Sequence, residues 1–344
     1  MRTGVSMIAV LSAALGLNWS VATQAADAVH AKQKPLVSKP VKSDGAEMIQ
    51  IPEGDYIIGS NKIDKTDFGR EFGNTKAWYL DEHPEHKARL PAFMIDKFEV
   101  TNTLYREFVK RGYNPPENWL DTGYIVSLRP EKLDKLDVEQ IRKLAVSRFK
   151  LDVDARTLSK EDLLEAIKKR WDAMGPLPVT YVSWFDADQY CKSVGKRLPK
   201  EVEWEAAARG TKTNEFPWGN DFAPGKSNTG EEDWEYGVSP VGSYQTDMSE
   251  FGVLDLAGNV SEWVADWYKP YAGSDYKSDN FGEQFKVFRG AGWGGSSGHY
   301  ALELFQRTAY RANLPPDAAN ADLGFRCAAD VPKSSTKIRQ APKN

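Results

Sequence analysis

Long hydrophobic runs are almost absent from this sequence. The clearest one is near the N-terminus, where Arg2 precedes an uncharged stretch of apolar and small residues, Val5–Leu17, with small residues again at 23–25. A run of about 13 residues suits the core of an export signal but is shorter than the roughly 20 that span a membrane. We therefore expect residues 1–25 to be a signal peptide. The alternative is an anchor helix that stays attached.

Cysteine is scarce as well, since Cys191 and Cys327 are the only two in 344 residues. Neither follows the apolar run, which argues against a lipid anchor. In an exported protein, two cysteines favour a disulfide over two free buried thiols. A bridge between them would close a loop of more than 100 residues, worth about 4–5 kcal/mol in the chain-entropy model. It would also leave no cysteine for thiol catalysis.

An excess of positive charge is missing too. The formal net charge is −4 and no basic stripe is present, so nucleic acid is not an expected partner. Residues 26–45 and 331–344 are polar and without periodicity, which predicts a disordered linker and a disordered tail. The chain's 11 Trp, 14 Tyr and 15 Phe are ample for a core, so we expect one domain over residues 46–330. The mature protein should be periplasmic or secreted, with no integral membrane segment.

Local patterns predict short strands first and a group of helices after them. Met48–Ser60 alternates apolar and polar residues as two strands joined by a turn, and Phe93–Val100 is a further strand candidate. From about residue 113 to 175 aromatic residues thin out, and capping signals at Asp137 and Ser159 start two helices. We interpret 113–175 as a helical insertion. It is either a solvated decoration or a lid that recognises a partner or substrate.

The main domain resumes near residue 178. One helix is expected after Ser183, and a second from Glu201 to Arg209 that stops at Gly210. From there to Asp330 the sequence is rich in Gly, Trp, Asn and Asp, with only brief periodic runs and no internal repeat. Bound cations and a disulfide can fix irregular segments that lack the hydrogen bonds of a sheet.

Five blocks of the sequence resemble the formylglycine-generating enzyme, or sulfatase-modifying factor, family. They include GVLDLAGNVSEWVADW and a last block that opens with FRGAGW and closes with LGFRC. The five blocks are Met48–Ser60, Asp81–Phe108, Pro178–Gly210, Gly252–Trp267 and Val287–Cys327. The resemblance covers nearly all of residues 48–330 except the insertion. It implies an α+β fold related to C-type lectins, with little regular secondary structure, and a disulfide that joins Cys191 to Cys327.

The resemblance also implies calcium as a cofactor, at two sites. In the first, side chains and carbonyl groups of DLAGNVSE would supply hard oxygen ligands: Asp255, Gly258, Val260 and Glu262. The second falls in a loop of variable length and would use Asn228, Thr229, Asp233 and Glu235. Considered without the family, Asp and Asn in such loops more often form turns than bind metal.

Copper and iron are not expected. Family members that make formylglycine hold copper with two cysteines of the last block and oxidise a substrate cysteine with oxygen. Thiolates suit Cu(I), but the segment from Gly290 to Arg307 contains no cysteine, so this activity is not expected here. Related sulfoxide synthases hold iron with three histidines. Only His299 of the four histidines in this chain lies at the corresponding loop, and the insertion contains none.

What remains at that position is a Gly-rich loop with Ser296, His299 and Glu303. A histidine and a carboxylate are suited to general acid–base catalysis at neutral pH, whereas the alternative is that these polar groups only satisfy one another. Some exported family members are associated with maturing another periplasmic molecule or enzyme. The resemblance thus favours an accessory or maturation protein that acts on, or holds, an exported protein or a small molecule. The alternative is a non-catalytic, lectin-like binding module.

Overall fold

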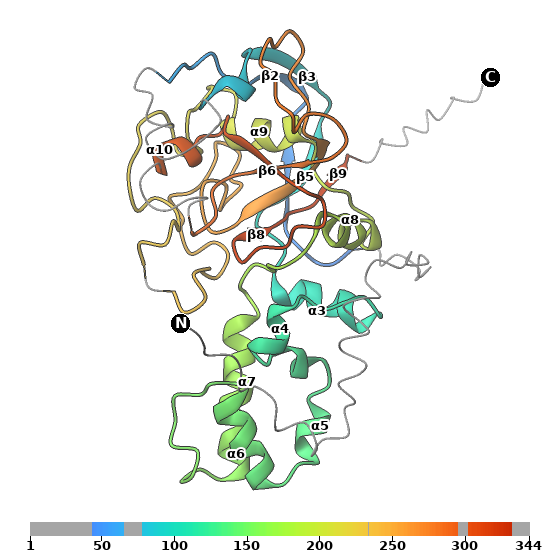
Figure 1. The fold of residues 1–344 in the computed structure, drawn as a ribbon, viewed down its shortest axis with the longest axis vertical. Coiled ribbons are helices and arrows are strands. Elements are labelled where there is room, and N and C mark those ends of the chain that lie inside the picture. The colour runs from blue at the N-terminus through green and yellow to red at the C-terminus, as the bar shows by residue number, and fades with distance from the viewer. Residues whose placement is uncertain (1–42, 65–77, 233, 295–301, 332–344) are drawn as a thin grey trace, which may run out of the picture. The chain divides into compact units, whose positions relative to one another are not determined.

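The structure is a computed structural model that describes residues 43–64, 78–232, 234–294 and 302–331. Helices and strands carry the labels of Figure 1. The expected signal peptide, most of the expected linker and nearly all of the expected C-terminal tail lie outside the described residues. Within them, no helix is long and apolar enough to cross a membrane.

The strands of the described residues are short and form three separate sheets. The first has the order β1–β4–β9, with all neighbours antiparallel: Met48–Ile51, Phe93–Asp96 and Ala328–Asp330. The second pairs β2 with β3: Gly54–Ile58 and His86–Leu90. The third has the order β7–β6–β5–β8: Arg311–Leu314, Lys286–Arg289, Ser261–Trp267 and Leu323–Gly324. The two strands expected in Met48–Ser60 are confirmed, and they enter different sheets.

The helices begin where the sequence signals them. In chain order, the α-helices and 3₁₀ helices are η1 (Leu80–Glu82), α3 (Asn102–Lys110), α4 (Asn118–Asp121), η2 (Tyr124–Leu128), α5 (Glu131–Asp134), α6 (Val138–Ser147), α7 (Lys160–Met174), α8 (Trp184–Ser193), α9 (Glu201–Arg209) and α10 (Leu302–Phe305). The side chains of Asp137, Ser159 and Ser183 each accept a hydrogen bond from the backbone N–H three residues later. These caps satisfy N–H groups that the first turn leaves without a partner. The predicted starts of α6, α7 and α8 are therefore confirmed.

The range expected for the insertion contains α4, η2, α5, α6 and α7, which lie together at the lower end of the ribbon in Figure 1. Their apolar faces share one buried cluster with the main domain. Trp119 and Ile141 of the insertion belong to the same cluster as Tyr105 of α3 and Tyr190 of α8. Large aromatic side chains contribute much of the buried area in such a core. The insertion is thus packed as part of the domain, not attached through a flexible hinge of polar residues.

The Gly-rich C-terminal half is held by buried charge pairs as well as by sheets. Arg289, Arg307, Arg311 and Arg326 are fully buried. Arg289 donates to Glu201 at 2.9 Å and to a second carboxylate of α9 at 2.8 Å. Removing one partner of a buried ion pair is costly, because the other charge stays desolvated. These pairs therefore hold irregular segments in one arrangement.

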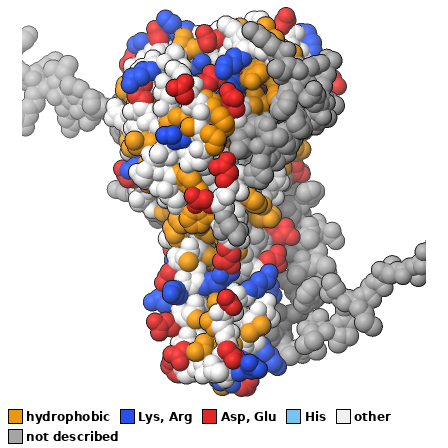
Figure 2. All heavy atoms as spheres, turned by 90° about the vertical axis from the view of Figure 1, so that its left-hand side faces the viewer, with side chains coloured by type: hydrophobic (Ala, Val, Ile, Leu, Met, Phe, Trp, Pro, Cys, Tyr) orange, Lys and Arg blue, Asp and Glu red, His pale blue; other side chains and the backbone are white. Residues whose placement is uncertain are grey.

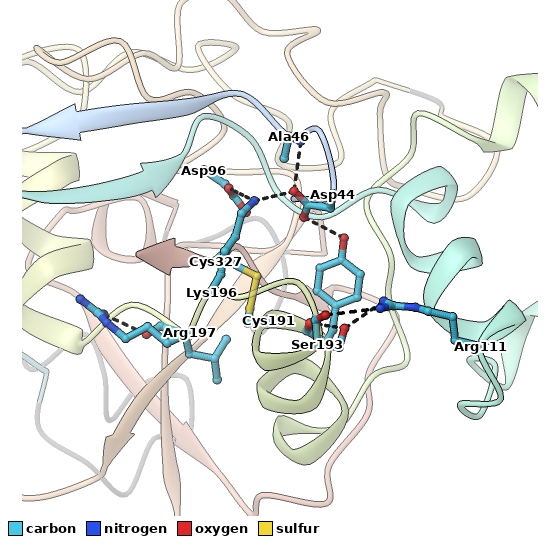
Figure 3. The surroundings of a disulfide bond; sticks show 11 residues. Asp44, Ala46, Asp96, Arg111, Cys191, Ser193, Lys196, Arg197 and Cys327 are labelled. Carbon is cyan, nitrogen blue, oxygen red and sulfur yellow. Dashed lines mark hydrogen bonds and ion pairs between the residues drawn. A yellow bond between two sulfur atoms is a disulfide. The ribbon is translucent and has the colours of Figure 1, made fainter. Parts of the chain in front are cut away.

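The disulfide expected from the sequence is present. Cys191 of α8 and Cys327 are bonded, with their Cα atoms 5.7 Å apart and a separation of 136 positions in the sequence. Figure 3 shows the bond beside a group of charged side chains. Since the sequence contains no other cysteine, no free thiol remains.

The end of the expected linker lies against the domain. Lys196 Nζ donates to Asp44 Oδ1 and to Asp96 Oδ1, each at 2.7 Å (Figure 3), and the Tyr190 hydroxyl donates to Asp44 Oδ2 at 3.0 Å. Burial alone would raise the pKa of Asp44, but pairing with Lys196 brings it below its usual value. The ordered domain thus includes Asp44, ahead of the expected boundary at residue 46. Composition could not show this, because one buried ion pair decides it.

Candidate functional site

A cleft of about 810 Å³ lies between the helical insertion and the rest of the domain. Pockets for small ligands typically have volumes of about 300–1,000 Å³. One wall comes from the insertion, through the end of α4, residues 148–150 and α7. The other comes from residues 230–232 and 234–238 with Trp293. Figure 2 shows hydrophobic side chains reaching the surface between the helical end and the part that carries the sheets.

One ion pair ties the two walls together. Arg170 of α7 donates from Nη1 to Glu235 Oε2 at 2.9 Å, and its guanidinium carbon lies 5.5 Å from the centre of the Tyr236 ring. The hydrogen bond from Arg170 lowers the pKa of the Glu235 carboxyl. A planar guanidinium suits this combination of carboxylate and aromatic partners. The loop that carries Glu235 is thereby held against the insertion.

Side-chain amides line the floor of the cleft. Trp119 Nε1 donates to Asn102 Oδ1 at 2.9 Å, and Asn102 Nδ2 donates to the Met174 carbonyl at 3.0 Å. Asn118 Nδ2 makes only a long contact of 3.4 Å with Thr180 Oγ1. Asn118 Oδ1 is buried and has no hydrogen-bond partner within the described residues. Such an acceptor is unusual in a folded protein, and as a buried atom it is not open to the cleft in this arrangement.

Unusual backbone geometry also occurs along the cleft. Tyr181 and Lys150 line it and have backbone φ angles of 56° and 47°. Residues other than glycine and asparagine rarely adopt this left-handed conformation. Gly237 has φ of 75°, and a Cβ there would lie 2.2 Å from the Trp293 ring, so only glycine fits. Backbone strain of this kind is often found at functional sites. Among the residues that line the cleft, Lys150 and Tyr181 carry it.

The residues expected at the former catalytic position are only partly visible. Ser296 and His299 lie outside the described residues, and Glu303 is an exposed residue of α10. Burial raises the pKa of the Tyr79 hydroxyl, and the negative charge of the Glu303 carboxylate raises it further. Glu303 does not line the cleft, whereas Trp293, just before the loop, does. General acid–base chemistry at this loop stays a prediction.

The first predicted calcium loop is folded around an arginine that the sequence analysis did not consider. Both oxygens of Glu262 accept from Arg326, at 2.6 and 2.7 Å, and one also accepts from Trp204 Nε1 at 2.9 Å. Oε2 of Glu262 thus accepts two hydrogen bonds and Oε1 accepts one, so any metal at this carboxylate would share it with Arg326. Asp255 Oδ2 accepts from the Gly242 N–H at 2.5 Å, and burial raises the pKa of Asp255 to about 6.

Glu99 is the neighbour of this loop that sequence reasoning missed. Its Oε1 accepts from Asn259 Nδ2 at 3.1 Å, and its Oε2 is buried without a hydrogen-bond partner within the described residues. Burial and the nearby Asp255 carboxylate raise the pKa of Glu99. An orphaned carboxylate oxygen beside a second carboxylate suits a hard cation. Glu99 and Asp255 also interact through a side-chain hydrogen bond, which a shared proton explains as well as a cation does. The signal in the sequence was only the acidic residue in FEVTN.

The second predicted calcium loop is joined to the first. Asn228 Nδ2 donates to the Gly237 carbonyl at 2.9 Å and to Asn259 Oδ1 at 3.1 Å. A Cβ on Gly258 would lie 2.5 Å from the Asn228 carbonyl oxygen, so the backbones touch there. Thr229 is buried, and Asp233 lies outside the described residues.

Two of the predicted ligands of these loops, Val260 and Glu235, were expected to contribute carbonyl oxygens. Val260 is buried, and the Glu235 side chain is bound to Arg170. In the described part of the chain, no three His, Cys, Asp or Glu side chains are grouped so as to hold a metal. Backbone carbonyl oxygens would supply the other half of the expected ligands. Both calcium sites therefore stay predictions.

Comparison with known proteins gives the family. The profile described as "Sulfatase-modifying factor enzyme 1-like domain" matches residues 33–331. The chain belongs to this family. The mouse protein named "Inactive C-alpha-formylglycine-generating enzyme 2" is 32% identical over 315 residues, which cover 83% of this chain and 86% of the mouse protein. The bovine "Formylglycine-generating enzyme" is 30% identical over 305 residues, covering 84% and 76% of the two chains.

Solved structures agree on the fold. The "Structure of PvdO from Pseudomonas aeruginosa" matches with a TM-score of 0.53 and 23% identity, and it covers 86% of this chain and all of PvdO. "Treponema denticola variable protein 1" also matches with a TM-score of 0.53, at 19% identity. At these identities the likeness shows the fold alone. The expected sulfatase-modifying factor fold, with mixed α and β elements, is confirmed.

Proposed function

We propose that this chain is a periplasmic or secreted accessory protein of the sulfatase-modifying factor family that holds an exported protein or small molecule and makes no formylglycine. One observation carries the proposal: the only two cysteines are joined in the Cys191–Cys327 disulfide. Copper-dependent oxidation of a substrate cysteine needs thiolate ligands of the enzyme, and no harder ligand pair replaces them readily for Cu(I). A relative named as inactive supports the same direction.

The cleft supplies a place for the bound molecule. It is concave, and it is partly lined by aromatic side chains. These are general properties of ligand sites. The insertion forms one wall, which supports its role in recognition over that of a solvated decoration.

The absence of formylglycine synthesis is tested directly. The mature protein is incubated with oxygen, copper and a cysteine-containing sulfatase peptide, and the peptide is then analysed by mass spectrometry. The bovine formylglycine-generating enzyme serves as the positive control. We expect no conversion by this chain, because it lacks the metal-binding thiolates. Conversion above the level of a copper-only control would contradict the proposal.

Holding is distinguished from chemistry in the cell. A strain that lacks the gene is complemented with the wild type, with Glu303→Ala or with His299→Ala. The amounts of the wild-type and variant proteins in the cell are compared, so that a loss of function is not confused with a loss of protein. Full complementation by both variants supports a holding role, since neither side chain is then needed. Loss of function in variants that fold normally would instead assign acid–base chemistry to the loop.

A further inference from the structure

The two walls of the cleft differ in charge. The insertion wall exposes two basic residues, Arg148 and Lys150, and one acidic residue, Asp121, whereas the opposite wall exposes Glu231 and Glu232. None of these side chains makes an ion pair within the described residues, so the insertion wall has an excess of positive charge and the opposite wall is negative. Arg148 donates to the Leu120 carbonyl at 2.7 Å, which holds its side chain at the end of α4 without neutralising its charge.

Where the walls touch, their charges do pair. Arg170 and Glu235 form that contact, at 17% and 61% side-chain exposure respectively. Arg148, Lys150, Glu231 and Glu232 form no ion pair across the cleft and stay available to a third molecule. Opposite potentials on two facing walls orient a bound molecule and repel one whose charges are all of one sign.

Between the charged walls lie the groups that a polypeptide would need. Trp234, Tyr236 and Trp293 are half-buried and offer aromatic faces. A cavity of about 810 Å³ also has room for several amino-acid residues in a row.

We propose that the cleft binds a short polypeptide segment of mixed charge, with an acidic side chain toward Arg148 and Lys150 and a basic side chain toward Glu231 and Glu232. An aromatic or apolar residue of the segment lies between these two charges, against Trp234 and Trp293. This inference rests on the proposed holding function and names the class of molecule that is held.

The first test uses a pooled library of acetylated, amidated peptides, in which two variable positions, each Asp or Lys, flank a central aromatic residue. Immobilised mature protein is exposed to the pool, and bound peptides are counted by mass spectrometry. We expect peptides with one Asp and one Lys to be enriched about tenfold over those with two of either. Equal enrichment of all charge patterns, or no binding at all, would overturn the inference.

A charge swap then assigns the acidic end of the segment. The double variant Arg148→Glu, Lys150→Glu should lose its preference for mixed-charge peptides and gain one for peptides with Lys at both positions. The matched control is Lys168→Glu, Lys169→Glu, which makes the same change of net charge on exposed residues of α7 that do not line the cleft. The control should bind as the wild type does. If it shifts equally, the preference reflects net charge and the proposed cleft is wrong.

The two proposals fail separately. Formylglycine production would refute the accessory function whatever the library shows. A protein that makes no formylglycine, complements the deletion and binds no peptide would keep its accessory function, and the polypeptide inference alone would be rejected.

Discussion

The disulfide provides the sharpest test of how this fold is stabilised. Cys191 and Cys327 are fully buried in the main hydrophobic cluster and lie 136 positions apart in the sequence. For a loop of that length the chain-entropy model gives about 5 kcal/mol of stabilisation, and measured losses on removing native disulfides are about 2–5 kcal/mol. Replacing both cysteines by alanine should therefore lower the free energy of unfolding by about 4–5 kcal/mol, with a small part due to the lost sulfur contacts.

Urea unfolding followed by tryptophan fluorescence measures this loss. The wild type is measured with and without a reductant, and the Cys191→Ala, Cys327→Ala variant is measured in the same two conditions. We expect the reductant to destabilise the wild type and to leave the variant unchanged, because the variant has no bond to reduce. This comparison separates the effect of the bond from the effect of the substitutions.

Two results would refute the reasoning. One is a variant whose free energy of unfolding lies within about 1 kcal/mol of the wild type, a difference ordinary for a single substitution. The other is labelling of both cysteines by a maleimide in the native protein without reductant. The second result would also remove the main support for the proposed function, since free thiolates would then be available to a metal.

The remaining predictions concern buried charge. Glu201→Gln weakens the pairing of two buried guanidiniums and should lower the free energy of unfolding, measured in urea, by about 3–5 kcal/mol. The exposed control Glu53→Gln should lower it by less than about 1 kcal/mol. Equal losses of free energy in the two variants would contradict this prediction. Calcium added to chelator-treated protein should raise its melting temperature, and Asp255→Asn should abolish the rise. If calcium leaves the melting temperature of the wild type unchanged, both predicted calcium sites are wrong. Burial lowers the pKa of Lys286 from 10.5 to about 8. Between these two pKa values the unfolded chain binds more protons than the folded one, so the free energy of unfolding should rise with pH across this range. The rise should be smaller in Lys286→Met. Parallel pH profiles of stability for the two proteins would contradict the lowered pKa.

Helix starts were predictable because their causes are local. At Asp137, Ser159 and Ser183 the side chain caps the N–H groups of the next turn, and the partner is only three residues away. The end of α9 at Gly210, with φ of 69°, has an equally local cause. Strand existence was predictable for the same reason. The sheet that each strand joins was not, because β1 and β2 are neighbours in the sequence but pair with different strands.

The predicted calcium residues show where sequence reasoning stopped. The family resemblance implied Asp255 and Glu262 as ligands of one site, and Glu262 is also bound by Arg326, which is 64 residues away. The orphaned oxygen lies instead on Glu99, 156 residues before Asp255 in the chain. Contacts over such separations leave no periodic trace in a single sequence.

The sequence by itself determined the family, the helix starts and the number of cysteines. Because there are only two cysteines, a disulfide between them leaves no thiolate for chemistry. These depend on residue identity and on short-range hydrogen bonding. Only the tertiary structure decided that the insertion shares the domain's core, that its wall faces residues 230–232 and 234–238 across a cleft, and which buried carboxylates have cationic partners. Each of these follows from side chains brought together by folding, where burial removes water and makes every unpaired charge or acceptor significant.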